Sequence, residues 1–245
     1  MSRFAEPPTL DRLVAGFPAP YAVEPRQIAE RAAHGPVTAI LDDDPTGTQT
    51  VSGVPVLTRW QPDDLRWALS QPGNAFFVLT NSRSLAPDEA AARTRQVVAA
   101  LAEVAAAQGV EYAVASRSDS TLRGHFPLET DVIAAEIEAR SGPVDAVLIV
   151  PAFPDAGRVT VDSVHWVRGP DAMVPAAQTE FARDAAFGYA SSDLREWVAE
   201  KSGGAVVASD VVALTLRELR AGPEHVAELL SRLHARQVVV VDAAC

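Results

Sequence analysis

The sequence contains a single cysteine, Cys245, and a single lysine, Lys201. One cysteine excludes an intrachain disulfide, as is usual in a reducing cytoplasm. The first residues, MSRFAEPPTLDRL, lack the apolar run of a signal peptide. No stretch of about 18 consecutive apolar residues is present that would span a bilayer. These absences predict a cytoplasmic protein without a membrane segment.

Positive charge is scarce overall. Lys and Arg together number 21 against 32 Asp and Glu, which gives a formal net charge of −11. Such an acidic chain repels nucleic acids and anionic membranes, so neither is expected as a partner. Because nearly all the cations are arginines, a site for an anion must be built from arginines that are concentrated locally.

The usual nucleotide-binding and hydrolase motifs are also missing. The sequence has no G-x-x-x-x-G-K-[ST] loop, no G-x-G-x-x-G loop and no G-x-S-x-G elbow. Its five histidines lack the spacing of metal ligands and have no cysteine nearby, so no zinc site is expected and no residue is assigned as a metal ligand. For His125 and His165, which lie in polar segments, we favour a structural hydrogen-bonding role over contact with a substrate.

What is present is a regular alternation of apolar and helical segments. Short runs rich in Val, Leu and Ile are typical of strands buried on both faces of a parallel sheet. These runs occupy residues 37–41, 54–58, 75–80, 112–115, 146–150, 205–208 and 238–241. Helices are expected at residues 25–33, 87–108, 128–140, 194–201 and 223–236. The pattern predicts a three-layer α/β fold with a mostly parallel sheet flanked by helices.

The length of 245 residues suits one large α/β domain, with two small domains as the alternative. We expect an amino-terminal extension with a short helix over residues 1–36, and an α/β domain over residues 37–245. Residues 151–192 are rich in Pro, Gly and polar residues. A segment of this length predicts a long irregular loop or a small inserted hairpin.

Four polar clusters directly follow predicted strands. They comprise residues 42–49, 81–84, 116–124 and 151–158. In open α/β sheets, ligands bind beyond the carboxyl ends of the strands. If the strands are parallel, all four clusters share one edge of the sheet.

The third cluster is the most informative one. It reads Ser116-Arg117-Ser118-Asp119-Ser120-Thr121-Leu122-Arg123-Gly124 and offers two guanidinium groups, a carboxylate and four hydroxyls. Arginine binds a carboxylate through paired N–H groups, and Asp and Ser bind hydroxyls. The cluster therefore suits a small, polyhydroxylated anion.

The other clusters allow more than one interpretation. The carboxylates of Asp42, Asp43 and Asp44 can hold Mg²⁺, orient sugar hydroxyls or accept a proton from a reacting alcohol. Alternatively, they cap the turn that precedes Gly47. Arg83 pairs either with the carboxylate of a ligand or with an aspartate at a strand end.

Together these clusters resemble the amino-terminal sugar-binding domain of the four-carbon acid sugar kinase family. The resemblance is carried by Asp43-Asp44-Pro45-Thr46-Gly47, by Ser82-Arg83, and by residues 117–124 and 151–158. Residues 179–184 and 187–189 also look like one branch of that family. The resemblance covers residues 37–242.

The resemblance implies ATP-dependent phosphorylation of a four-carbon sugar acid, such as threonate, erythronate or 3-oxo-tetronate, at its terminal hydroxyl. It also implies that ATP and Mg²⁺ are held mainly by a carboxyl-terminal nucleotide-binding domain, in cis or in trans. We expect that domain to be absent from this chain, which would then be inactive alone. The candidate bases are Asp43, Asp44 and Asp119. The expected substrate-binding residues are Asp43, Asp44, Thr46, Arg83, Arg117, Ser118, Asp119, Ser120, Arg123 and Arg158.

Two other functions stay open at this point. One is a sugar-acid-binding module without catalysis. The other is a phosphatase of the haloacid dehalogenase type, since Asp42-x-Asp44-x-Thr46 after an apolar strand matches that family's first motif, with Asp42 as nucleophile. The second acidic motif of such an enzyme is not found, and Lys201 is the only lysine available to it. A homodimer is an alternative to a monomer.

Overall fold

The computed structural model describes residues 7–244, which form two compact units. Unit 1 contains the chain through Tyr21, Ser120–Arg123 and the chain from Val144 onward. Unit 2 contains Ala22–Asp119 and Gly124–Pro143. The polar segment 116–124 therefore contributes residues to both units.

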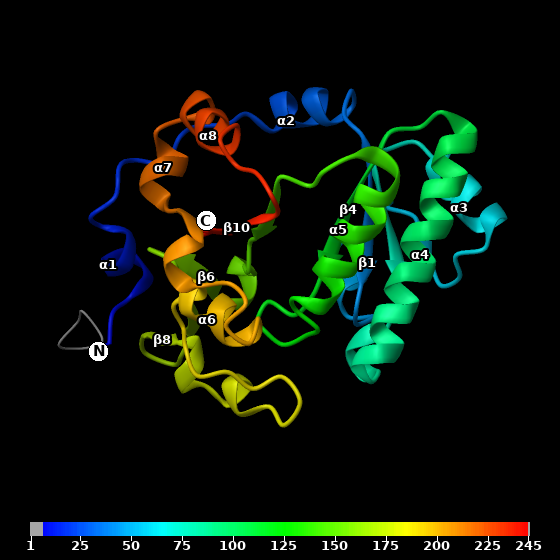
Figure 1. The fold of residues 1–245 in the computed structure, drawn as a ribbon. Coiled ribbons are helices and arrows are strands. Elements are labelled where there is room, and N and C mark those ends of the chain that lie inside the picture. Colours follow the sequence, from blue (N-terminus) through cyan, green and yellow to red (C-terminus); the bar gives the residue numbers. More distant parts are fainter. Residues whose placement is uncertain (1–6, 245) are drawn as a thin grey trace. The chain divides into compact units, whose positions relative to one another are not determined.

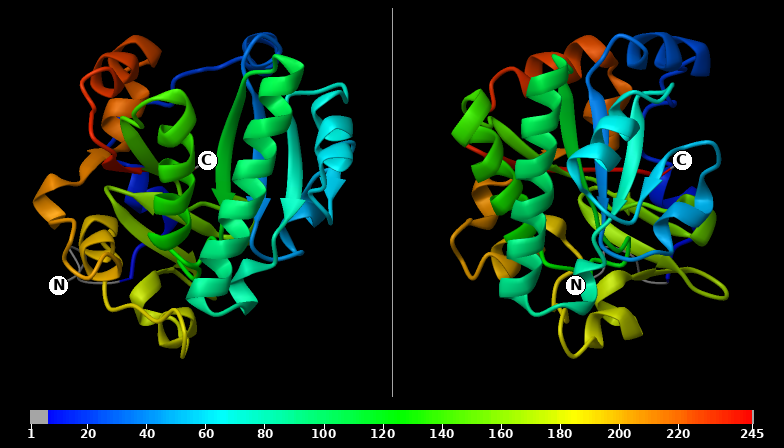
Figure 2. Two further views of the ribbon diagram at one scale, coloured as in Figure 1. Left: turned by 45° about the vertical axis from the view of Figure 1, so that its right-hand side comes forward. Right: turned by 90° about the vertical axis from the view of Figure 1, so that its right-hand side faces the viewer.

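Unit 2 is built on a parallel sheet, sheet A, with strand order β2-β3-β1-β4. Its strands are β1 (Val37–Asp42), β2 (Val56–Leu57), β3 (Ala75–Leu79) and β4 (Tyr112–Arg117). Its helices are α2 (Pro25–Ala32), α3 (Pro62–Leu69), α4 (Pro87–Gln108) and α5 (Leu128–Ser141). Figures 1 and 2 show α4 and α5 running alongside the strands of this sheet.

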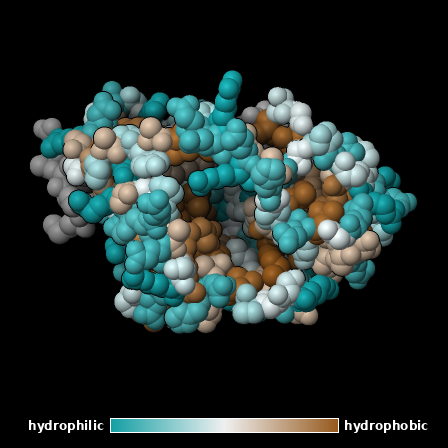
Figure 3. Space-filling view, turned by 90° about the horizontal axis from the view of Figure 1, so that it is seen from above, coloured by the Kyte–Doolittle hydropathy of each residue, from teal (hydrophilic) through white to brown (hydrophobic). Residues whose placement is uncertain are grey.

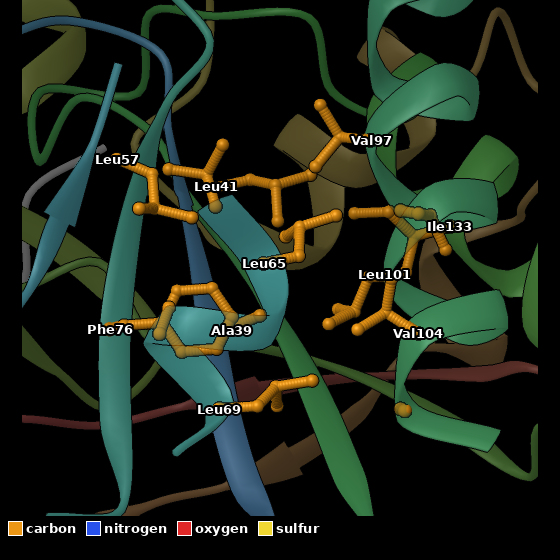
Figure 4. Close-up of a cluster of buried hydrophobic side chains, with 14 residues drawn as sticks. Ala39, Leu41, Leu57, Leu65, Leu69, Phe76, Val97, Leu101, Val104 and Ile133 are labelled. Atoms are coloured by element: carbon orange, nitrogen blue, oxygen red, sulfur yellow. The ribbon is translucent and has the colours of Figure 1, made fainter. Parts of the chain in front are cut away.

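The core of unit 2 lies between sheet A and helices α3, α4 and α5 (Figure 4). The parallel register places Ala39 beside Phe76 on the face that α4 covers, and both side chains are fully buried. From α4, Val97 and Leu101 meet this face and are also fully buried. Each large apolar side chain that is removed from water stabilises the fold by about 1.5–3 kcal/mol.

Helix α4 begins and ends where its sequence predicts. Pro87 occupies the first turn, where its missing N–H costs nothing, and Asp88 and Glu89 add negative charge at the positive helix start. Gly109 ends the helix in a left-handed conformation, with φ of 66°.

Unit 1 contains a parallel sheet B with order β5-β10-β9 and an antiparallel sheet C with order β6-β7-β8. The strands are β5 (Ala146–Ile149), β6 (Arg158–Val161), β7 (Val164–Arg168), β8 (Met173–Pro175), β9 (Val212–Leu214) and β10 (Gln237–Val241). The helices are α1 (Leu10–Val14), α6 (Leu194–Lys201), α7 (Leu216–Arg220) and α8 (Pro223–Leu230).

Asp242, at the carboxyl end of β10, links sheet C to sheet B through hydrogen bonds. Its buried carboxylate accepts the backbone N–H groups of Asp162 and Ser163, at 2.7 and 2.8 Å, and that of Leu216 at 2.9 Å. Asp162 and Ser163 form the turn between β6 and β7 with φ of 53° and 63°. One carboxylate thus holds both the sheet C hairpin and the start of α7.

The predicted α/β class, with a mostly parallel sheet flanked by helices, is confirmed. Within residues 151–192, the small-hairpin alternative is found, extended by a third strand to form sheet C. Helix α1 belongs to unit 1, where Leu13 is buried among Val159, Trp166 and Leu216.

The prediction of one edge shared by all four polar clusters is wrong. The strand before residues 151–158 is β5, which pairs with β10 in sheet B, whereas the other three clusters follow strands of sheet A. Buried parallel strands have similar sequences whichever neighbour they pair with, so their sequences do not assign them to a sheet.

Two predicted elements are also corrected. Residues 205–208 form no strand, and the strand of this region is β9, further along the chain. Val207 is 56% exposed, and it follows Gly203 and Gly204, both with positive φ. Helix α8 ends at Leu230 rather than at residue 236, and Ala235 and Arg236 adopt positive φ, which excludes them from a right-handed helix.

No helix within residues 7–244 is long and apolar enough to cross a membrane. Hydrophilic side chains cover most of the face shown in Figure 3, with apolar side chains in smaller areas between them.

Candidate functional site

The site in unit 2 is set up by the backbone at the carboxyl end of β1. The carbonyl oxygen of Asp42 accepts hydrogen bonds from Thr80 N and Oγ1, both at 2.9 Å. On the other side, Asp43 N donates to Arg117 O at 3.2 Å. The ends of β3 and β4 are thereby fixed against the aspartates that follow β1. We call Asp42, Asp43, Asp44, Arg83, Arg117 and Ser118 the strand-end cluster.

Arg83 and Asp43 form the closest ion pair of this cluster. Arg83 donates from Nε to Oδ2 at 3.0 Å and from Nη2 to Oδ1 at 2.6 Å. Ser118 Oγ also donates to Asp43 Oδ2, at 3.1 Å. The paired geometry fixes the guanidinium plane. Guanidinium carries five N–H donors, so the two given to Asp43 leave others on the same group.

Arg117 pairs with Asp42, and its Nη1 donates to Oδ1 at 3.1 Å. The Asp42 side chain is completely buried, and Oδ2 has no hydrogen-bond partner among the described residues. Burial raises the pKa of Asp42, and the positive charge of Arg117 opposes this shift. Arg117 is about one-third exposed and is the more accessible partner.

Asp44 has a different role from its two neighbours. Its Oδ1 accepts the N–H and the hydroxyl of Thr46 at 2.9 and 2.6 Å, which closes an Asx turn. These hydrogen bonds lower the pKa of Asp44. Arg83 Nη1 also lies 3.5 Å from Asp44 Oδ2. The capping interpretation therefore holds for Asp44, although the carboxylate stays partly exposed.

Glycine is required at two points of the cluster. A Cβ atom at Gly47 would collide with Asp42 Oδ2 and with the Arg117 guanidinium. Gly124 has φ of +144°, and its Cβ would collide with Ser118 Oγ and lie 3.2 Å from Asp43 Oδ2. The backbone approaches the ion pairs closely at both positions.

A second group of predicted residues lies in unit 1. We call Ser120, Arg123, Arg158, Phe181 and Asp184 the loop cluster. Arg158 Nη1 donates to Ser120 Oγ at 3.1 Å. The guanidinium groups of Arg123 and Arg158 lie 5.1 and 5.4 Å from the centroid of the Phe181 ring, within the range of cation–π attraction.

The loop cluster is held by hydrogen bonds to backbone carbonyls. His165, fully buried on β7, donates from Nε2 to Ser120 O at 2.7 Å. Tyr189 Oη donates to Thr121 O at 2.9 Å. Arg123 Nη1 lies 3.6 Å from Asp184 Oδ2. With two guanidinium groups and one carboxylate, the loop cluster carries excess positive charge.

The predicted site residues thus fall into two groups. Asp43, Asp44, Thr46, Arg83, Arg117 and Ser118 come together in unit 2, while Ser120, Arg123 and Arg158 come together in unit 1. Asp119 follows Ser118 in unit 2 and places a further negative charge near Arg83.

Several residues that contact the two clusters were not predicted as site residues. Glu129 on α5 and Thr80 gave no signal in the sequence, whereas Phe181 and Tyr189 lie in the segments 179–184 and 187–189 that carry part of the family resemblance. Acidic residues in the first turn of a helix usually indicate capping, so Glu129 gave no separate signal. The structural role expected for the two histidines is confirmed, since His125 Nε2 donates to Ser82 O at 3.1 Å and His165 donates to Ser120 O.

The geometry disfavours a phosphatase that uses Asp42 as nucleophile. The Asp42 carboxylate is fully buried and bonded to Arg117. Lys201 donates to Phe187 O and Gly188 O, at 3.0 and 2.9 Å, and so serves the backbone of unit 1. Within residues 7–244, no group of three or more His, Cys, Asp and Glu residues is arranged to hold a metal ion.

Comparison with known proteins decides the family. Residues 38–245 match the family of sugar-binding N-terminal domains. The chain belongs to this family. The match confirms the predicted resemblance to the four-carbon acid sugar kinases.

Individual relatives extend the comparison. The chain is 36% identical over 115 residues to a D-erythronate kinase of Heliobacterium modesticaldum, covering 46% of this chain and 23% of that protein. It resembles the crystal structure of a domain of unknown function from Bordetella bronchiseptica, a domain-swapped dimer with bound citrate. In that comparison the TM-score is 0.59 and the identity 28%, over 86% of this chain and 49% of the other.

A Haemophilus influenzae protein shares the fold, with a TM-score of 0.60 and 17% identity over 84% of this chain and 48% of that chain. The chain thus spans about half the length of these solved relatives, and the 115 residues that match the erythronate kinase cover less than a quarter of that protein.

Proposed function

We propose that this sugar-binding domain binds a four-carbon sugar acid of the erythronate or threonate type for an ATP-dependent kinase. The observation that carries the proposal is the strand-end cluster, where two arginines are held rigidly by buried aspartates. The erythronate kinase relative supports the substrate class. The citrate bound to the Bordetella protein supports a small hydroxylated carboxylate as ligand.

In this proposal, the remaining N–H groups of Arg83 and Arg117 bind the carboxylate of the sugar acid. The sugar hydroxyls bind to Ser118 and to the aspartates. Asp43 already accepts three hydrogen bonds, which makes it the least suitable of the three candidate bases. We therefore assign proton acceptance from the terminal hydroxyl to Asp44 or Asp119, and Asn substitutions distinguish the two.

The phosphoryl donor in the proposal is ATP with Mg²⁺, in the cytoplasm. Among the described residues, no group of three or more His, Cys, Asp and Glu side chains is arranged to hold a metal ion, so we assign no residue of this chain to Mg²⁺ and no catalytic step to it. Nucleotide binding is assigned to a further domain in cis or in trans. The domain-swapped Bordetella dimer makes self-association a quantity to measure alongside binding.

Calorimetric titration with three ligands of similar size tests the proposal. D-erythronate has a carboxylate and hydroxyls, erythritol only hydroxyls, and succinate only carboxylates. We expect saturable binding of the sugar acid and at least about tenfold weaker binding of both analogues, because each lacks charge-assisted or hydroxyl hydrogen bonds. Equal affinity for all three, or no binding of any four-carbon sugar acid to folded protein, would contradict it.

A further inference from the structure

The two arginines of the strand-end cluster share a feature of sequence and structure. Arg83 directly follows Ser82, and Arg117 directly follows Ser116. Both serines bind the same carboxylate, that of Glu129 on α5. Ser82 Oγ donates to Glu129 Oε1, and Ser116 Oγ donates to Oε2 at 3.4 Å.

The Glu129 carboxylate contacts residues at the ends of both strands that neighbour β1. Ser82 follows β3, and Ser116 lies in β4, and these strands are the two neighbours of β1. In β4, successive side chains point to opposite faces of the sheet. Ser116 can therefore bind α5 on one face while Arg117 reaches Asp42 from the other.

The groups that face Glu129 are few. Its side chain is 5% exposed, and Ser82 is fully buried. His125 donates to the carbonyl of Ser82, and Thr80 Oγ1 lies 3.2 Å from Ser82 Oγ. The charged or titratable neighbours are Asp43 and His125. An ionised carboxylate only accepts hydrogen bonds, so it satisfies both serine hydroxyls at once, which a protonated carboxyl does less well.

We infer that Glu129 is a positioning residue for the two arginines that bind the sugar acid. Asp42 and Asp43 hold the guanidinium ends of these side chains, and Glu129 holds their backbones through the preceding serines. Each arginine is thereby fixed at both ends before a ligand arrives. The inference rests on the proposed function for its consequence in binding, but the holding of the arginines can be measured without ligand.

The test uses Glu129→Gln, with Glu136→Gln as matched control. Glu136 lies on the same helix, and its carboxylate pairs with Arg140 and Arg95, outside the cluster. The first readout is solvent exchange, by ¹⁵N NMR in unliganded protein, of the Arg83 Nε–H and Arg117 Nη1–H groups that donate to Asp43 and Asp42. We expect faster exchange in Glu129→Gln only. The second is affinity for D-erythronate, expected to fall at least about tenfold.

The pH dependence of arginine exchange and of sugar-acid affinity distinguishes a loss of arginine positioning from a general loss of stability. Burial raises the pKa of Glu129. In the wild type, protection of Arg83 Nε–H and sugar-acid affinity should both fall as the pH drops through that pKa, whereas Glu129→Gln should lack this step. If the Gln variant does not fold, Ser82→Ala, which removes a donor and keeps the carboxylate, provides the same readouts.

Identical exchange rates and pH profiles in Glu129→Gln and Glu136→Gln overturn the inference, whether or not a ligand binds. If exchange differs as expected but the wild type binds no sugar acid, the proposed function fails while the positioning of the arginines by Glu129 is upheld.

Discussion

The strand-end cluster and the loop cluster use arginine in different ways. In the strand-end cluster, each guanidinium is paired with a buried aspartate at the end of a parallel strand. In the loop cluster, the guanidinium groups of Arg123 and Arg158 lie on an aromatic ring, and the one carboxylate is 3.6 Å from Arg123. The first arrangement gives rigid geometry, and the second gives excess positive charge. Similar motif residues therefore form two different arginine arrangements, one paired with carboxylates and one packed on an aromatic ring.

The largest expected loss of stability comes from breaking the buried ion pair of Arg83 and Asp43 in the strand-end cluster. Asp43→Ala leaves Arg83 without its main partner in a mostly buried setting. Removing one member of such a pair should lower the free energy of unfolding by about 3 kcal/mol. The matched change Asp63→Ala removes the exposed partner of Arg66 and should cost less than about 1 kcal/mol. Urea denaturation measures both, and equal losses would refute the distinction between buried and exposed pairs.

A smaller loss of stability is expected when a side chain is added at Gly124, where the backbone lies close to the strand-end cluster. Gly124→Ala should lower the free energy of unfolding by about 2–3 kcal/mol, because it adds a collision with Ser118 to an unfavourable φ. Gly203→Ala also meets a positive φ, but its value of +63° lies in the left-handed helical region, and no atom lies within 4 Å. Gly203→Ala should therefore lower the free energy of unfolding by about 1 kcal/mol. Equal costs in thermal or urea unfolding would mean that the close approach to Ser118 is unimportant.

In the loop cluster, Phe181→Leu keeps an apolar side chain and removes the ring. Each cation–π contact contributes about 0.5–1 kcal/mol, so the variant should lose about 1–2 kcal/mol of stability. A double-mutant cycle with Arg158→Gln should give a coupling energy of about 0.5 kcal/mol or more. A coupling energy of zero would show that the ring and Arg158 act independently.

The smallest expected effect is a change in how the stability of the fold depends on pH through the pKa of Asp44. Its pKa is lowered by the hydrogen bonds from Thr46, so it contributes stability above its unfolded-state pKa, which is lost as the pH falls through the lowered value. Thr46→Val removes the hydroxyl and should raise the pKa of Asp44 towards its ordinary value. Carboxyl ¹³C NMR titration measures this shift, and an unchanged pKa would show that the hydroxyl contributes nothing.

Much of the strand-end cluster could be predicted from the sequence. The apolar run before Asp42, and the Ser-Arg pairs at or just beyond the carboxyl ends of the neighbouring strands, follow from local patterns in one parallel sheet. Helix α4 was bounded correctly by Pro87 and Gly109, because helix ends depend on local backbone preferences.

The features that could not be predicted from the sequence depend on contacts between segments that are far apart in the chain. Strand β5 was predicted, but its membership of sheet B rests on its pairing with β10, some 90 residues later. Glu129 lies beside the strand-end cluster only because α5 brings it there, and Phe181 belongs to the loop cluster because the loop after sheet C places it under two arginines. Glutamate is common in helices, so the residue type of Glu129 carried no signal, and the family resemblance of residues 179–184 did not show which groups Phe181 contacts.

The central claim is that the arginines of the strand-end cluster bind a four-carbon sugar acid. Its most direct test is the affinity for D-erythronate of Arg83→Lys, compared with Arg66→Lys on the exposed surface of α3. Both variants keep the charge, but lysine cannot form the paired hydrogen bonds of arginine. We predict at least about tenfold weaker binding for Arg83→Lys and wild-type affinity for Arg66→Lys. Equal affinity in the two folded variants would contradict the account.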